Sequence, residues 1–292
     1  KRKVMYGYVF ILPFIIGIIV FFAFPLILSL ALSFGKIDKI VGIKVTLTGF
    51  ENYVRAFVID PSFLPTLWKV AKQVAIRVPL IIVFSMVISI LINKDIKFKG
   101  FFRTVFFLPF LLGTGHVMNQ LLGQDIANDT LATARGIIVP PEVMAYLGSS
   151  VGNAIDAILN EITLVLWKTG VQVLLFLSGL QTIPVSLYES ARIDSATEWE
   201  MFWKITLPMM SPMLLLNIIY TIIDSFTDMS NPILSYIQNT SFKQFKYEYA
   251  AAMGWIYFVL IIIIISIVFY ALRNYVYDTS YERKVGKKWR QE

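Results

Sequence analysis

The sequence contains no cysteine and a single histidine, His116, among its 292 residues. Disulfides, thiolate chemistry and cysteine-ligated metals are therefore excluded, and one histidine leaves little for a histidine-ligated metal site. Charge is scarce as well, because 15% of the residues are charged while 57% are hydrophobic, and the mean hydropathy is +0.69. A water-soluble domain of this length needs more charge to cover its surface. We therefore predict an all-α, polytopic membrane protein that carries no cofactor.

Six segments are apolar and long enough to cross a bilayer core about 30 Å thick, which takes roughly 20 helical residues. The expected spans cover residues 8–32, 67–92, 101–122, 162–180, 208–227 and 249–272. Pro13 and Pro25 predict kinks in the first span. The second span carries Lys69, Lys72 and Arg77 in its first half, which is therefore expected to face protein or water.

Lysine and arginine in the short loops indicate the orientation. With both termini in the cytoplasm of a cell that carries the chain in its plasma or inner membrane, most of the 26 basic residues fall on the inner side. The net charge of +7 is then a topological signal and not a nucleic-acid patch. The expected parts are an anchor helix with its outer segment (1–65), a core (66–275) with an outer insertion (123–161) and a cytoplasmic loop (182–208), and a basic tail (276–292).

The outer insertion 123–161 is acidic, and two interpretations of it stay open. It either meets an external partner or caps a pathway, or it is a solvated connector.

The cytoplasmic loop is expected to form two short helices. Ser186 and Glu189 match a capping box that would start the first helix at Leu187, and either Ser195 with Glu198 or Thr197 with Glu200 offers a second box. A turn is expected at Asp194 and Ser195. Because a helix of about two turns is not stable alone, it should pack into something. The alternative is an ordinary amphipathic helix that lies on the membrane, for which Trp199, Phe202 and Trp203 are suitable residues.

The residues of this loop resemble a known family. The run Glu189-Ser-Ala191, Asp194-Ser-Ala196, Phe202 and Ile205-Thr-Leu-Pro208 is similar to the EAA loop of permease subunits in binding-protein-dependent ABC importers of the sugar-uptake type. The segments 49–53, 98–109 and 176–184 are also similar to that family. Two residues depart from its pattern, since Ser190 replaces an alanine and Ser195 replaces a glycine. A left-handed backbone at Ser195 would cost more than at glycine.

The resemblance implies that the first short helix is a coupling helix seated in a groove of a separate ATPase. The ATPase-coupling residues would be Glu189, Ser190, Ala191, Asp194, Ser195, Ala196 and Phe202. Further partners would be a second permease subunit, identical or related, a second ATPase subunit and an extracellular solute-binding protein. The chain has no G-x-x-x-x-G-K-[ST] motif, so it is not expected to be an enzyme or to bind ATP through a P-loop.

Polar side chains inside apolar spans are the candidates for solute contact, because they are costly unless they face a cavity or a partner. The candidate pathway residues are Asn119, Gln120, Lys168, Gln172, Asn217, Tyr220, Asp224, Asp228, Trp255 and Tyr257. Asn217, Tyr220 and Asp224 share one helix face. Lys168 and Asp224 could instead pair between helices, and the two aromatic residues could instead belong to the interfacial belt.

The resemblance implies import of a carbohydrate, with an oligosaccharide as the expected solute. Two other classes are weighed against it. An ion-gradient-driven secondary transporter should show internal repeats with broken spans, which the sequence lacks. An intramembrane enzyme needs a catalytic pair within the bilayer, and His116 stands in no such motif.

Overall fold

A computed structural model describes residues 2–39, 44–94, 100–101, 104, 161, 165–166, 168–228 and 231–275. It divides the chain into two units, residues 1–72 with 227–264 and residues 73–226 with 265–292. Three described helices are long and apolar enough to cross a membrane, Phe10–Ser33, Phe63–Asn93 and Tyr247–Tyr275, and two bent pairs bring the number to as many as five. The expected third span, the insertion 123–161 and the basic tail lie almost wholly outside the described residues. The predicted all-α membrane fold is confirmed.

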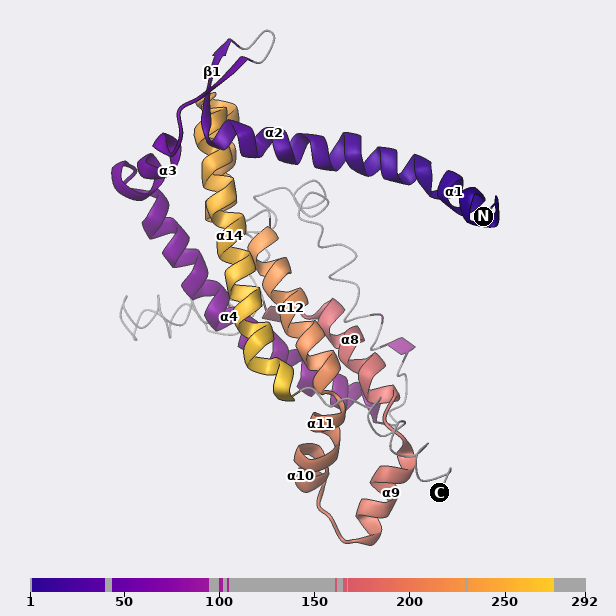
Figure 1. Cartoon of the computed structure of the whole chain (residues 1–292). Helices are drawn as coiled ribbons and strands as arrows, with labels where there is room; N and C mark the ends of the chain where they lie inside the picture. The colour runs from indigo at the N-terminus through magenta and orange to yellow at the C-terminus, as the bar shows by residue number, and fades with distance from the viewer. Residues whose placement is uncertain are drawn as a thin grey trace, which may run out of the picture. The chain divides into compact units, whose positions relative to one another are not determined.

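The first unit begins with an unbroken helical run (Figure 1) made of α1 (Arg2–Ile18), the π-helical turn η1 (Ile19–Ala23) and α2 (Phe24–Ser33). Pro25 has no N–H to donate to the carbonyl of Phe21, so the regular α-helical ladder is interrupted there. The π turn lies directly before this proline, and the N–H of Phe24 closes it on the carbonyl of Ile19. The disturbance expected at Pro25 therefore takes the form of a π turn.

The segment after α2, which is expected to lie on the outer side, contains a hairpin that was not predicted from the sequence. Strands β1 (Gly35–Lys39) and β2 (Lys44–Leu47) pair antiparallel, with Gly35 opposite Leu47. Gly49 follows with φ of +76°, a backbone conformation that glycine adopts without strain. The chain then forms α3 (Glu51–Val54) and the π turn η2 (Arg55–Ile59).

The second outer segment of this unit is also helical, which was likewise not predicted. It consists of α13 (Pro232–Gln238) and the π turn η4 (Asn239–Lys243), and it leads into the long helix α14 (Tyr247–Leu272), which ends in the 3₁₀ turn η5 (Arg273–Tyr275). Asn231 caps α13, since its side chain accepts a hydrogen bond from the N–H of Ile233 at 3.0 Å.

Asp60 ties these outer segments together at the start of α4 (Phe63–Asn93). Its Oδ1 accepts from the N–H groups of Ser62 and Phe63, and its Oδ2 accepts from the hydroxyls of Tyr236 at 2.7 Å and Tyr249 at 2.5 Å. Burial raises the pKa of the Asp60 carboxyl, but these four hydrogen bonds outweigh it and hold the pKa below its usual value. Burial and the bond to Asp60 raise the pKa of Tyr236 to about 12. The cluster is therefore a carboxylate held by two neutral phenols at neutral pH.

The second unit packs α8 (Gly170–Gln181) against α4 and α12 (Ser211–Thr227). Ile88, Ile92, Val173 and Leu177 form a buried apolar cluster between α4 and α8. Ser89 donates to the carbonyl of Val173 at 3.0 Å and links the same two helices. These contacts fix α8, which carries the candidate pathway residue Gln172 near its start and leads into the loop 182–208 at its other end.

A glycine sets the approach of α8 to α12. A Cβ built on Gly179 would lie 2.8 Å from Cγ of Met213, so a larger residue would force these helices apart. Arg77, in the basic half of α4, makes an ion pair with Glu161. This contact agrees with the expectation that this half faces protein or water.

Candidate functional site

The loop between α8 and α12 projects two short helices, as the sequence predicts (Figure 1). The first is α9 (Val185–Ile193), and the second is α10 (Glu198–Met201), which continues through the π turn η3 (Phe202–Thr206) and α11 (Leu207–Met209). The chain bends by 66° between α8 and α9 and by 69° before α12. The first bend lies at the end of α8 and the second at the start of α12, so the loop turns away from the axes of both helices.

No residue of α9 is buried, although the helix carries apolar side chains. Val185 and Ile193 are 69% and 83% exposed, and Glu189 and Ser190 are also exposed. A nine-residue helix with this much exposed apolar surface gains little stability from its own chain. The helix therefore presents its side chains on the surface of the described part of the chain.

The turn after α9 has the hydrogen bonds of a Schellman motif. The N–H of Ser195 donates to the carbonyl of Arg192 at 3.0 Å, and the N–H of Ala196 donates to the carbonyl of Ala191 at 2.9 Å. Ser195 has φ of +60°, so the left-handed backbone considered at this position is present. The turn expected at Asp194 and Ser195 is therefore confirmed, and it is made without the glycine that suits it best.

One of the predicted capping boxes is confirmed and another is wrong. Thr197 accepts from the N–H of Glu200, whose carboxylate accepts from the N–H of Thr197, as a capping box requires. The box of Ser186 and Glu189 does not form, because α9 begins two residues early with Pro184 at the N-cap. Proline with φ of −62° and ψ of 131° starts the helix itself, which places Ser186 inside the first turn and leaves Glu189 exposed.

Two side-chain contacts that the sequence analysis missed brace the loop. The hydroxyls of Tyr188 and Thr206 lie 2.9 Å apart and join α9 to η3, and Thr206 is buried. Arg192 and Glu198 form an exposed ion pair with 3.4 Å between Nη2 and Oε1. A cavity of about 220 Å³ lies between these residues and the end of α4. Tyr188 directly precedes Glu189, but no local pattern shows that its partner comes from the second half of the loop.

The second half of the loop presents an aromatic cluster. Trp199 and Phe202 stack with ring centroids 6.1 Å apart, and Trp203 meets both rings edge-on. Trp199 is exposed, so the cluster offers apolar surface outward as well as to itself. These are the residues expected at the interface of headgroups and acyl chains.

The candidate pathway residues of the fourth and fifth spans meet between α8 and α12. Lys168 Nζ lies 3.3 Å from Asp224 Oδ2, so the helix-to-helix pair that was one of the two alternatives is present. Gln172 donates to Thr221 at 3.3 Å, and Asn217 donates to the backbone carbonyl of Gln172 at 3.0 Å. The result is a ladder of polar contacts along two helices.

Within the part of the chain that the structure describes, the amide oxygens of Gln172 and Asn217 have no hydrogen-bond partner, although both side chains are buried. Tyr220 and Asp228 are half-buried on the same helix or at its end. Asn119 and Gln120 lie outside the described residues. Unpaired buried acceptors in this ladder are costly.

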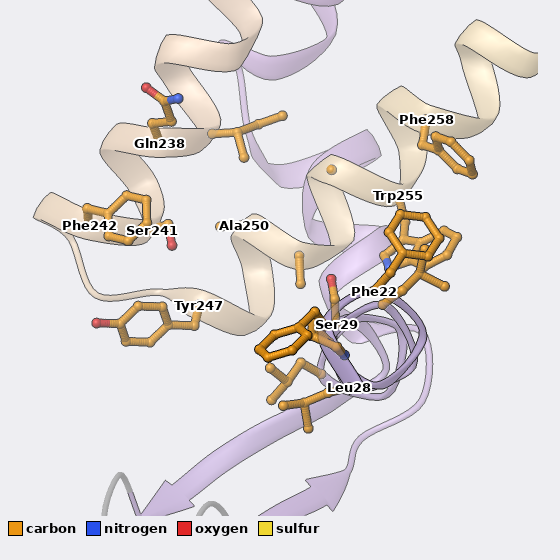
Figure 2. A pocket seen from close by; sticks show the side chains of 17 residues that line it. Phe22, Leu28, Ser29, Gln238, Ser241, Phe242, Tyr247, Ala250, Trp255 and Phe258 are labelled. Atoms are coloured by element: carbon orange, nitrogen blue, oxygen red, sulfur yellow. The ribbon is translucent and has the colours of Figure 1, made fainter. Parts of the chain in front are cut away.

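The two aromatic candidates on α14 lie in different surroundings. Tyr257 is buried, and its hydroxyl accepts a hydrogen bond from Asn231 at 2.8 Å. Trp255 lines a cavity of about 690 Å³, whose lining comes from η1 and α2, from α13 and η4, and from α14 (Figure 2). Figure 2 shows mostly apolar side chains there, among them Phe22, Leu28 and Phe258. A solute rich in hydroxyls needs more polar partners, so these surroundings favour the belt interpretation of Trp255.

Among the described residues, no group of three histidine, aspartate or glutamate side chains could hold a metal ion. The site consists of an exposed short helix, a braced loop and a polar contact between two apolar helices. Together they define a helical membrane protein with a structured loop between two of its candidate spans.

The comparisons with known proteins identify the family. No protein-family model matches the chain. It is 30% identical over 301 residues to the "Probable ABC transporter permease protein YesP" of Bacillus subtilis, covering 97% of this chain and 95% of that protein. It is 28% identical to the "Arabinooligosaccharides transport system permease protein AraP" of Halalkalibacterium halodurans, with 89% and 85% covered. The chain belongs to the permease subunits of ABC transporters.

A solved structure agrees on the fold. One chain of a crystal structure described as "a bacterial ABC transporter involved in the import of the acidic polysaccharide alginate" matches with a TM-score of 0.65 at 19% identity, covering 94% of this chain and 96% of that one. With the family shown, the resemblance drawn from the loop residues is confirmed. Neither a secondary transporter nor an intramembrane enzyme is supported.

Proposed function

We propose that this chain forms half of the pathway of a carbohydrate importer and receives the motion of an ATPase through α9. The observation that carries the proposal is the exposure of α9, whose apolar ends and Glu189 face outward from a loop held by the Tyr188–Thr206 bond and the Ser195 turn. A helix that is rigidly connected to the spans but unburied transmits force from whatever holds it.

The structure supports a route for that force. The hydroxyl of Tyr188 joins α9 to Thr206, four residues before the break that opens α12. Movement of α9 therefore reaches α12 directly, and it reaches α8 through the three residues that separate the two helices. Closure of the two ATPase subunits on ATP can alter the pathway only if it favours one packing of α8 against α12 over an alternative packing.

The polar ladder between α8 and α12 is the proposed pathway face. Lys168, Gln172, Asn217, Tyr220 and Asp224 all lie on it. In this conformation the groups satisfy one another in part. A shift of the two helices would free amide and carboxylate groups for hydroxyls, which are the partners that a carbohydrate offers.

The proposed solute is an oligosaccharide. AraP is described by its name as a permease for arabinooligosaccharides, and the structural neighbour takes part in alginate import. The proposed partners are a second, related permease subunit, two ATPase subunits and an extracellular solute-binding protein. Both termini are proposed to lie in the cytoplasm, which places α9 on the ATP side. This orientation rests on the distribution of lysine and arginine.

The test is reconstitution of the chain in proteoliposomes with its second permease subunit, the ATPase and the binding protein. We expect uptake of a labelled oligosaccharide. This uptake should require ATP on the side of the membrane where the ATPase subunits lie and binding protein on the opposite side. Vesicles that lack only this chain are the control. Uptake by this chain alone, without an ATPase, would contradict the proposal.

A further inference from the structure

The segment of residues 50–59, which contains α3 and η2, exposes its apolar face and turns its polar face toward the protein. Its large apolar side chains point away from the protein: Phe50, Val54, Phe57, Val58 and Ile59 are 69%, 51%, 50%, 77% and 67% exposed. The positions 50, 54, 57 and 58 follow the helical repeat, so these residues share a stripe. A contiguous stripe of this kind is not expected to face water.

The side of the segment that faces the protein is the polar one. Asn52 is buried and donates to the carbonyls of Ser33 at 3.2 Å and Gly35 at 3.0 Å. The hydroxyl of Tyr53 lies 2.8 Å from that of Ser33. The protein therefore fixes which way the stripe faces, because rotating the helix would break these bonds.

The charges of the segment are kept off the middle of the stripe. Arg55 lies over the ring of Tyr249, 4.6 Å from its centroid, so its guanidinium is turned back toward α14. Glu51 lies at the N-terminus of α3, where a carboxylate is favourable for the helix dipole. The three residues that end the segment, Phe57, Val58 and Ile59, carry no charge at all.

The position of the segment identifies what covers the stripe. Asn52 binds the last turn of α2, which ends the apolar and largely unburied candidate span Phe10–Ser33, and Asp60 at the other end caps α4. Both helices are candidate membrane spans, so the segment connects the end of one candidate span to the start of the next. Near the start of α4, Trp68 is also exposed. Tryptophan at a span end is typical of the membrane–water interface.

We propose that residues 50–59 lie in the membrane interface, with Phe57, Val58 and Ile59 among the acyl chains of the lipid. The partner is the bilayer itself, since the segment joins two candidate membrane spans that also expose apolar side chains. The segment thereby anchors the α2–α4 connection at a fixed depth, and the Asp60 cluster transfers that anchoring to α13 and α14. The proposal holds for any solute and does not depend on the route of coupling.

The absence of cysteine makes the test direct, because a single introduced cysteine is the only one in the chain. Val58→Cys carries a spin label in the assembled complex in nanodiscs of phosphatidylethanolamine and phosphatidylglycerol. Thr46→Cys, exposed on the hairpin, is the aqueous reference, and Ile27→Cys, exposed on α2, is the lipid reference. Ile59→Cys repeats the test if the first variant assembles poorly.

We expect the label at position 58 to collide more often with dissolved oxygen than with a water-soluble nickel chelate, as at position 27, with the opposite ratio at position 46. Equal access to the nickel chelate at positions 58 and 46 would overturn the proposal. Low access to both quenchers would also overturn it, because the stripe would then be covered by protein. Failure of carbohydrate uptake in the same complex would leave this result standing.

Discussion

The turn at Ser195 offers a prediction whose sign is set by one backbone angle. Ser195 adopts φ of +60°, and its N–H and that of Ala196 close the Schellman bonds that end α9. We expect Ser195→Gly to stabilise this turn, because glycine has no Cβ to crowd the left-handed conformation. The side chain of Ser195 is exposed, so little contact is lost with it.

The magnitude follows from two opposing effects. The left-handed conformation costs a residue with a Cβ about 1–2 kcal/mol. Glycine loses more backbone entropy on folding, which takes back about 0.5–1 kcal/mol. The net gain is about 0.5–1 kcal/mol, which corresponds to a roughly two- to fivefold decrease in local opening of the turn.

Hydrogen exchange measures this opening directly, since the amides of Ser195 and Ala196 are protected only when the turn is closed. The amides of position 195 and of Ala196 should exchange roughly two- to fivefold more slowly in Ser195→Gly than in the wild type. Ser190→Gly is the matched control, because Ser190 lies inside α9, where glycine costs about 0.5 kcal/mol and should speed exchange. Faster exchange in Ser195→Gly than in the wild type would refute the reasoning.

Three further predictions concern stability. Lys168→Met should lower the free energy of unfolding by about 1–2 kcal/mol, because it leaves the half-exposed Asp224 without its lysine. Adding Asp224→Asn should restore part of that loss, and thermal unfolding of the four proteins of the double-mutant cycle measures both effects. Thr197→Ala should lower the free energy of unfolding by about 1 kcal/mol. It should also speed amide exchange at Glu200, whose N–H donates to the hydroxyl of Thr197. The pKa of Asp60 lies below its ordinary 3.8 in the folded protein, so its ionised carboxylate stabilises the fold. This stabilisation is complete above about pH 4 and is lost as the pH falls through the folded pKa. Asp60→Asn should therefore unfold more easily than the wild type at pH 7, and the difference should shrink below pH 4.

The spans and the loop could be predicted because their signals are local. A run such as 249–272 is apolar over the thickness of a bilayer, and α14 covers it from Tyr247 to Leu272. The turn at Ser195 and the capping box at Thr197 depend on residues within a few positions of one another. The box at Ser186 was wrong because Pro184 begins the helix earlier, and a side chain within the first turn cannot act as its N-cap.

The contacts that hold the outer segments could not be predicted, because their partners are distant. Asp60 lies 176 residues from Tyr236 and 189 from Tyr249 in the sequence, and each of these residues alone is unremarkable in an outer loop. The hairpin at 35–47 has no strong alternation of apolar and polar residues, since its strands carry several lysines. The Lys168–Asp224 pair could be named in advance only because charge inside an apolar span demands a partner.

The central claim is that α9 couples this permease to an ATPase, and the charge of Glu189 tests it most directly. Binding-protein-stimulated uptake of labelled oligosaccharide is measured in proteoliposomes that hold wild type, Glu189→Lys, or Glu51→Lys, which makes the same change of charge in the outer segment. We expect Glu189→Lys to abolish stimulated uptake at an unchanged membrane level of the chain, while Glu51→Lys retains it. Normal uptake by Glu189→Lys would contradict the coupling role of α9.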